Sequence, residues 1–290
     1  MIQLNLSQLA SVCDDERLKT DFEKAHSVYH KFFKPITEPY IWVFDSDVSL
    51  GDKLRATKSI GDFNRVHWLD LYNSVSAAEN IFYRRSHTIL LSSFKSLTKS
   101  DFLSAAILAR SLLEVCMWNV YHSAVFEQTI SSIKENPNKN VLASPELQDY
   151  ILKLIWGTNE KNVVEELKQH KIYKIFQKVA KSAKRHHSNP VDIEKLYDAL
   201  CEYVHPNVEG NNLFVDFDIN AQLKPASEVK LEISYEQSAD KSNNPIEVII
   251  EVIIWCFSAS IFASQRYGKT RQLLIKKFDL RNFGKKPTFH

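Results

Sequence analysis

Apolar positions along most of the chain recur every three or four residues, the spacing of a helix with one buried face. The pattern predicts an opening helix from about Leu9 to Phe33, which Pro35 would end. Further helices are expected over residues 76–97, 101–133, 145–156, 160–186 and 191–205, and a last apolar helix after Pro245. We therefore expect a mainly α protein built as a helical bundle.

The period changes from helical to alternating in one part of the chain. The segments LFVDFDI at 213–219 and VKLEISY at 229–235 place apolar and charged residues in turn. Alternation of this kind indicates strands with one buried and one wet face. A small β-hairpin at about 213–236 is therefore expected before the last helix.

The chain shows no internal repeat and no low-complexity linker. The most economical division is a helical extension over residues 1–75, packed on a bundle over residues 76–290 that carries the hairpin and a basic C-terminal tail.

Composition supports helices and an intracellular location. Only 6 of 290 residues are glycine, which disfavours a fold with many tight turns. The four cysteines are far apart and form no CxxC pair, as expected of buried thiols in a reducing compartment. The first residues lack the basic start and long apolar run of a signal peptide. We expect a cytoplasmic protein.

Two apolar stretches come close to the length that crosses a membrane, Phe102 to Tyr121 and Ile246 to Ala263. Each carries two charged residues, and each charge at the centre of a bilayer would cost about 2.5–3.5 kcal/mol on insertion scales. We interpret both stretches as core helices and expect no membrane partner.

Arg110 and Glu114 are the only charged residues between Phe102 and Tyr121. Their i, i+4 spacing brings the two side chains together on one helix face. Because the surrounding helix is apolar on all sides, we expect both to be buried and paired. The pair is either a structural brace between helices or the floor of a polar site.

The segment YDALCEYVHPN, residues 197–207, holds a second group of polar residues. His205 falls in the last turn of its predicted helix, where the helix dipole favours an imidazolium. It is either a catalytic acid or base, or a hydrogen-bonded cap that ends the helix.

The strings ARSLLE and YVHPN resemble an uncharacterised branch of the HEPN superfamily, helical-bundle proteins of prokaryotic defence and toxin systems, many of which are RNases. The resemblance covers about residues 76–210. It implies that Arg110, Glu114, Tyr197 and His205 converge on one polar pocket. Active HEPN RNases carry an Arg followed four to six residues later by a His, and this spacing does not occur in the chain.

Two basic clusters stand out although the formal net charge is only +2. The first recurs every three or four residues on one helix face and comprises Lys171, Lys174, Lys178, Lys181 and Arg185. The second runs from Arg266 to Lys286 and is interrupted only by Asp279. Both are candidates for contacts to nucleic-acid phosphates, although most lysine stripes of this kind are only solvated faces.

A metal site is a third interpretation. Glu23-x-x-His26 and Glu202-x-x-His205, with Glu114 and Glu251, supply the residue types of a di-metal carboxylate bundle. Arg110 beside Glu114 argues against this interpretation. The chain has no glycine-rich nucleotide loop and no GxSxG elbow, so we expect no cofactor.

The leading hypothesis is a HEPN-like protein of a bacterial defence or toxin system that binds or cleaves RNA, if catalytic as a metal-independent endoribonuclease. His205 would exchange protons with a ribose 2′-hydroxyl, and Arg110 would stabilise the charged phosphorus centre. The alternative is a helical scaffold without enzymatic activity that binds a partner protein or forms a homodimer.

Overall fold

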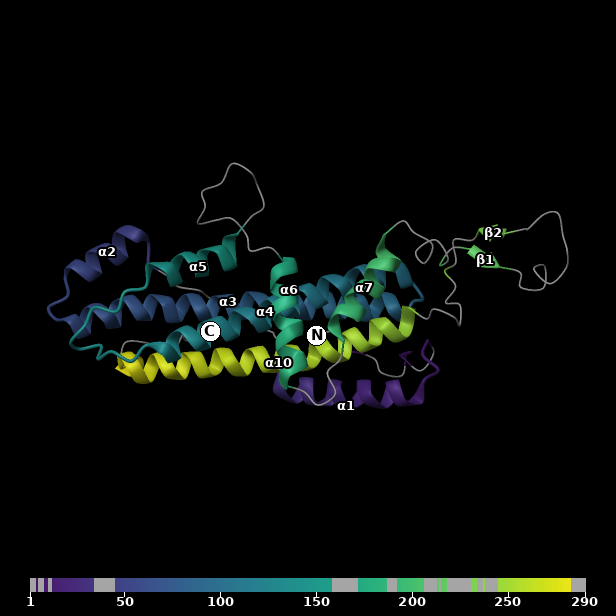
Figure 1. Ribbon diagram of the computed structural model, residues 1–290, viewed down its shortest axis with the longest axis horizontal. Helices are drawn as coiled ribbons and strands as arrows, with labels where there is room; N and C mark the ends of the chain where they lie inside the picture. The colour runs from purple at the N-terminus through teal and green to yellow at the C-terminus, as the bar shows by residue number, and fades with distance from the viewer. Residues whose placement is uncertain are drawn as a thin grey trace. The chain divides into compact units, whose positions relative to one another are not determined.

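The structure is a computed structural model that describes residues 4, 8–9, 12–33, 45–157, 172–186, 192–205, 213, 215–217, 231–233, 237 and 245–282. Its helices are α1 (Glu16–Phe32), α2 (Asp47–Arg55), α3 (Ile60–Leu97), α4 (Phe102–Ser132), α5 (Pro145–Trp156), α6 (Ile172–His186), α7 (Ile193–Val204) and α10 (Pro245–Phe278), followed by a 3-10 turn at Leu280–Asn282 (Figure 1). The prediction of a mainly α protein is confirmed.

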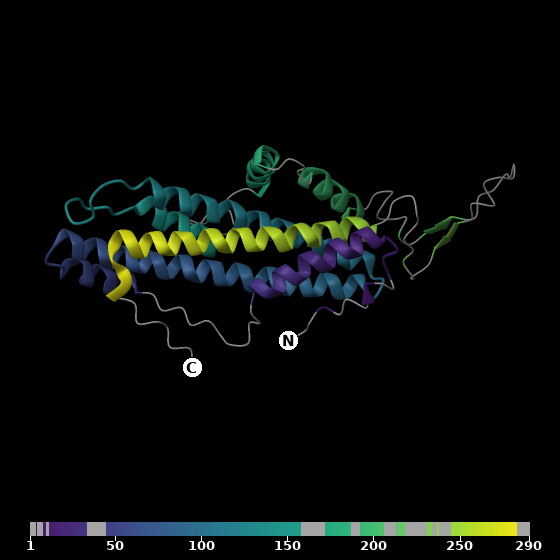
Figure 2. The same cartoon turned by 90° about the horizontal axis from the view of Figure 1, so that it is seen from below.

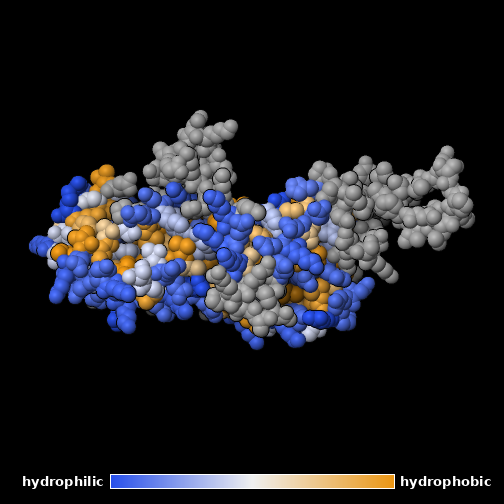
Figure 3. All heavy atoms as spheres, viewed as in Figure 1, coloured by the Kyte–Doolittle hydropathy of each residue, from blue (hydrophilic) through white to orange (hydrophobic). Residues whose placement is uncertain are grey.

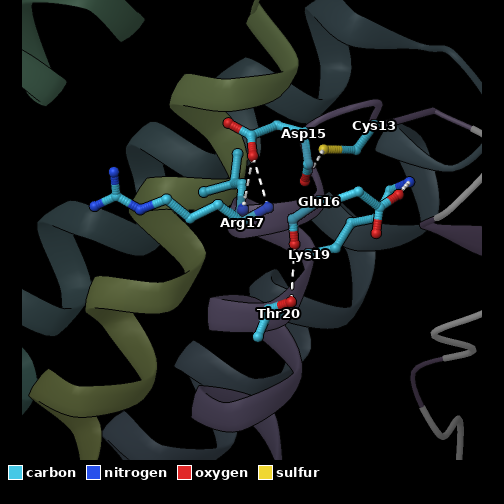
Figure 4. A network of polar contacts seen from close by, with 7 residues as sticks. Cys13, Asp15, Glu16, Arg17, Lys19 and Thr20 are labelled. Atoms are coloured by element: carbon cyan, nitrogen blue, oxygen red, sulfur yellow. Dashed lines mark hydrogen bonds and ion pairs between the residues drawn. The ribbon is translucent and has the colours of Figure 1, made fainter.

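Helix α1 begins at Glu16, later than the predicted start near Leu9. Asp15 is the N-cap residue, and its Oδ1 accepts hydrogen bonds from the backbone N–H groups of Arg17 and Leu18 at 2.8 and 3.0 Å (Figure 4). A side chain that satisfies these two donors defines the first turn. The helix start is thus a local feature that the Asp15 position explains.

Two helical segments between residues 45 and 75 were not predicted. Helix α2 is capped by Ser46, whose Oγ accepts from the Ser49 N–H at 3.2 Å. Helix α3 begins at Ile60 rather than at residue 76, and Ser59 Oγ accepts from the Asp62 N–H at 3.0 Å and donates to its carboxylate at 2.7 Å. This reciprocal pairing is a capping arrangement.

The described helices belong to two compact units, each built from three chain segments. Unit 1 contains residues 1–34, 85–116 and 180–259, and unit 2 contains residues 35–84, 117–179 and 260–290. The division predicted between residues 75 and 76 falls inside α3.

The core of unit 1 includes aromatic contacts between α1, α3 and α10. The fully buried ring of Phe22 lies 5.6 Å from the ring of Phe94 and 5.6 Å from that of Phe257. Figures 1 and 2 both show α1 running alongside the first half of α10. Burial of such large rings is a principal source of stability for this unit.

The core of unit 2 joins α3, α4, α5 and α10. The ring of Trp68 stacks on that of Phe278 with centroids 4.5 Å apart. Phe126 is fully buried and contacts the rings of Tyr150 and Tyr267 at 5.6 and 6.1 Å.

Asn64 and His67 of α3 hold the connection between α4 and α5. The fully buried Asn64 amide donates to the carbonyl oxygens of Pro137 and Asn140 at 2.6 and 2.7 Å and accepts from the Leu142 N–H at 2.9 Å. One side chain thereby satisfies three backbone groups of this loop.

Two short strands pair in antiparallel fashion, β1 (Val215–Phe217) and β2 (Leu231–Ile233), with Asp216 opposite Glu232. Most of the predicted hairpin at about 213–236 lies outside the described residues. The full hairpin stays a prediction.

By length and composition, α4 and α10 are each apolar enough to cross a membrane, and 56% of the most apolar window of each is buried inside the protein. Core helices pass the same test. The interpretation of both as core helices stays a prediction.

Candidate functional site

Three of the four predicted catalytic residues come together in unit 1 and form what we name the Arg110 cluster: Arg110, Glu114 and Tyr197. The Arg110 Nη2 donates to the Tyr197 hydroxyl at 3.0 Å, and that hydroxyl donates to Glu114 Oε1 at 3.0 Å. Arg110 Nε lies 3.5 Å from the same Oε1. The Arg110 guanidinium also lies 5.2 Å from the centroid of the Tyr197 ring. The cluster links α4 to α7.

The expectation that Arg110 and Glu114 are fully buried is wrong, because both side chains are partly exposed. Their side chains are 27% and 32% exposed. The reason is that they lie on the part of α4 facing α7, which covers them only partly, whereas Leu112 and Leu113 on other faces of α4 are fully buried. Water therefore reaches part of both side chains of the ion pair.

Burial raises the pKa of Tyr197 above its ordinary value, with the Glu114 carboxylate adding to the effect and Arg110 opposing it. The phenol thus stays protonated and keeps its role as donor to Glu114. Cys201 lies one turn further along α7, and burial raises the pKa of its thiol although Arg110 opposes the shift. Both groups are neutral, so the cluster carries one positive and one negative charge.

His205 does not share these contacts. It follows the last residue of α7, its side chain is exposed, and its backbone N–H donates to the Cys201 carbonyl at 3.0 Å. Tyr197 and His205 are separated by about 12 Å along the helix axis, at a rise of about 1.5 Å per residue. The structure brings together Arg110, Glu114 and Tyr197 and leaves His205 at the helix end.

Helix α6 presents the first basic cluster as predicted for an amphipathic helix. Lys174, Lys178 and Lys181 are exposed, while Ile175 and Val179 on the opposite face are buried. Among the residues that the structure describes, no carboxylate pairs with these three lysines. Lys171 and the side chain of Arg185 lie outside the described residues.

The second basic cluster was predicted to meet acid only at Asp279, but several of its members form ion pairs with carboxylates of unit 2. Glu127 pairs with Arg266 at 3.6 Å and with Lys269 at 3.4 Å, and Glu79 pairs with Arg271. Phosphate contacts by these residues would have to displace carboxylates. The partners lie far away in the sequence, on α3 and α4, so the local charge pattern did not reveal them.

The described residues offer no group of three or more His, Cys, Asp or Glu side chains suited to a metal ion. Three members of the proposed di-metal set, Glu23, Glu202 and Glu251, are exposed. The di-metal interpretation receives no support from this part of the chain.

The sequence did not predict two contacts, one at the lysines of α6 and one at the Arg110 cluster. Lys178 Nζ donates to the Tyr121 hydroxyl at 3.0 Å and lies 5.0 Å from the centroid of its ring. Cys201 adjoins the Arg110 cluster. Its position four residues after Tyr197 on the same helix could have predicted this from the sequence, because such residues lie on one helix face. The contact between Lys178 and Tyr121 joins segments that are far apart in the chain, so no spacing in the sequence could have predicted it.

A comparison with known proteins finds no matching family model, no similar curated protein and no similar solved structure.

Proposed function

We propose that the protein binds RNA at the Arg110 cluster and cleaves it there, as a HEPN-like member of a bacterial defence or toxin system. The observation that carries the proposal is the link between α4 and α7, in which Glu114 and Tyr197 contact the partly exposed Arg110 side chain. RNA is proposed as the ligand because the ARSLLE and YVHPN strings resemble the HEPN superfamily, many members of which are RNases.

The exposed ion pair allows a phosphate to compete with Glu114 for Arg110. An ion pair with more than a quarter of each side chain exposed is screened by water and contributes about 0–1 kcal/mol. A guanidinium forms charge-assisted hydrogen bonds to phosphate oxygens, often two at once. A phosphate would therefore bind to N–H donors that the carboxylate holds only weakly.

Cleavage would transfer a proton from the ribose 2′-hydroxyl to a base while its oxygen attacks phosphorus, and the bond to the 5′ oxygen would break as that oxygen gains a proton. His205 is the proposed acid or base, and Arg110 would stabilise the charge on the phosphoryl oxygens. His205 lies about 12 Å along α7 from Tyr197. For His205 and Arg110 to contact the same phosphate, the RNA strand or the end of α7 would have to move toward the Arg110 cluster. Binding thus has more structural support than cleavage.

The test compares Arg110→Ala with Arg65→Ala. Arg65 pairs with Asp62 and is 28% exposed, close to the 27% of Arg110, so the control removes an equal charge from a similar setting. Affinity for a labelled single-stranded RNA is measured by fluorescence anisotropy, and cleavage is followed on a denaturing gel. We expect Arg110→Ala to weaken binding by about 10- to 100-fold, the equivalent of about 1.5–3 kcal/mol.

The variant His205→Ala distinguishes RNA cleavage from RNA binding. It should abolish cleavage and leave the affinity close to that of the wild type. Equal affinity of the Arg110→Ala and Arg65→Ala proteins would refute RNA binding at the cluster, and full cleavage by His205→Ala would refute the assigned role of that residue.

A scaffold that binds a partner protein or a second copy of the chain is the second candidate. The observation in its favour is that Arg110, Glu114 and Tyr197 contact one another in a closed triangle of two hydrogen bonds and one ion pair. Breaking a fully buried pair costs about 3–5 kcal/mol, and the partial exposure makes that figure an upper bound. If Arg110→Ala lowers the melting temperature while neither it nor His205→Ala changes RNA binding or cleavage, the scaffold function is the better account.

A further inference from the structure

The two basic clusters of the chain differ in whether acids neutralise them. Arg266, Lys269 and Arg271 of α10 are paired with carboxylates, as described above. In unit 2, Lys174 and Lys178 of α6 project from a helix whose residues 172–186 include no Asp or Glu, and no carboxylate of the described residues pairs with them. Within the part of the chain that the structure describes, no acid neutralises their positive charge.

Lys178 is held in place by Tyr121 of α4. Its ammonium group donates to the phenol oxygen at 3.0 Å and lies 5.0 Å from the ring centroid. A free lysine loses about 1.5–2 kcal/mol of rotamer entropy when it is fixed on a ligand. Tyr121 contributes part of this ordering in advance, and the ammonium group keeps two further N–H donors.

We propose that Lys174, Lys178 and Tyr121 form a second contact site, which binds the phosphodiester backbone of single-stranded RNA without sequence preference. The site rests on the proposed function for its ligand and adds to it a backbone contact separate from the Arg110 cluster. Lys174 and Lys178 are one helical turn apart on one exposed face, about 6 Å along the axis. Figure 3 shows hydrophilic residues on the face of α6 that is turned toward the viewer.

The chemistry favours a nucleic-acid backbone over other anionic partners. A basic helix face that is exposed to solvent neutralises phosphates and gains affinity mainly from counterion release. The buried face of α6 is occupied by its own core residues Ile175, Phe176 and Val179. The helix therefore has no apolar face left to insert into a lipid surface, as membrane-bound amphipathic helices do.

The test is the salt dependence of RNA binding by the full chain. The variant Lys174→Gln/Lys178→Gln is compared with Lys95→Gln/Lys99→Gln, which removes the same charge from two exposed lysines, one in the last turn of α3 and one in the turn that follows it. The probe is a labelled single-stranded RNA homopolymer of about 20 nucleotides, long enough to span several contacts. The slope of log Kd against log salt should fall by about 1.4 in the α6 variant, at about 0.7 for each lost phosphate contact to a single strand.

Tyr121→Phe keeps the ring and removes the hydroxyl, so it tests the holding role of Tyr121. We expect its affinity to fall by a few fold while its salt slope stays that of the wild type, because no charge is lost.

The outcomes separate this site from the Arg110 cluster. Loss of slope and affinity in the α6 variant alone supports the site, even where Arg110→Ala binds as the wild type does and the proposed cluster fails. A slope change equal to that of the Lys95→Gln/Lys99→Gln control overturns it. Binding of poly-glutamate or of phosphatidylserine vesicles through α6, with no binding of the RNA, also overturns it.

Discussion

His67 should make the protein sensitive to acid, and the effect can be isolated with one substitution. The side chain is 3% exposed and lies on α3 in unit 2. Its Nε2 accepts a hydrogen bond from the Ser144 N–H at 3.3 Å, so the folded protein requires a ring that is unprotonated at this nitrogen. Burial lowers the pKa of His67 from 6.5 to about 4.

The sign of the effect follows from the lowered pKa. Between pH 4 and 6.5 the unfolded chain binds a proton at His67 and the folded protein does not, so acid favours unfolding. The contribution of His67 is fully present above about pH 6.5 and is lost as the pH falls toward 4. The loss is about 2 kcal/mol at pH 5 and about 3 kcal/mol at pH 4.

His67→Gln provides the comparison, because the Gln Oε1 can accept from the Ser144 N–H and does not titrate. Urea unfolding is followed by circular dichroism at pH 7.5 and at pH 5 for both proteins. Burial also lowers the pKa values of His26 and His87, and these groups contribute equally to both proteins and cancel in the comparison. The wild type should lose about 2 kcal/mol more than His67→Gln over this range. Equal losses in the two proteins would refute the assignment of acid sensitivity to His67.

Three further predictions concern packing and hydrogen bonding. Asn64→Ala leaves three backbone groups of the α4–α5 connection without their partner and should cost about 2–4 kcal/mol in urea unfolding. The control is Gly51→Ala on α2, where the added Cβ meets only the flexible Arg55 side chain and the higher helix propensity of alanine should raise stability by about 0.5–1 kcal/mol. Phe22→Ala removes a fully buried ring and should cost about 3–5 kcal/mol; a loss below about 1 kcal/mol would show that α1 contributes little to unit 1. Tyr197→Phe removes both hydrogen bonds of the phenol and should lower stability by about 1–2 kcal/mol, whereas an unchanged melting temperature would mean that the cluster is not a brace.

The local parts of this structure were accessible from the sequence. The i, i+3 and i, i+4 spacing of apolar residues predicted α4, α5 and α7 close to their observed ends, and it predicted the start of α10. The end of α10 was not predicted, because the helix continues to Phe278 through the basic residues that were expected to form a tail. The Arg110–Glu114 pair followed from the same spacing, because both residues lie on one helix and their geometry depends on that helix alone. The exposed lysines of α6 followed from it as well.

Contacts between distant segments required the tertiary structure. Tyr197 was expected near Arg110 only from a resemblance, and its bonds to Arg110 and Glu114 depend on how α7 packs against α4. The carboxylates that engage the basic residues of α10 lie on α3 and α4, so sequence charge alone made that cluster look free. Partial exposure of the Arg110 cluster was missed for the same reason: a helix pattern identifies which residues share a face, and only the neighbouring elements decide how much of that face water reaches.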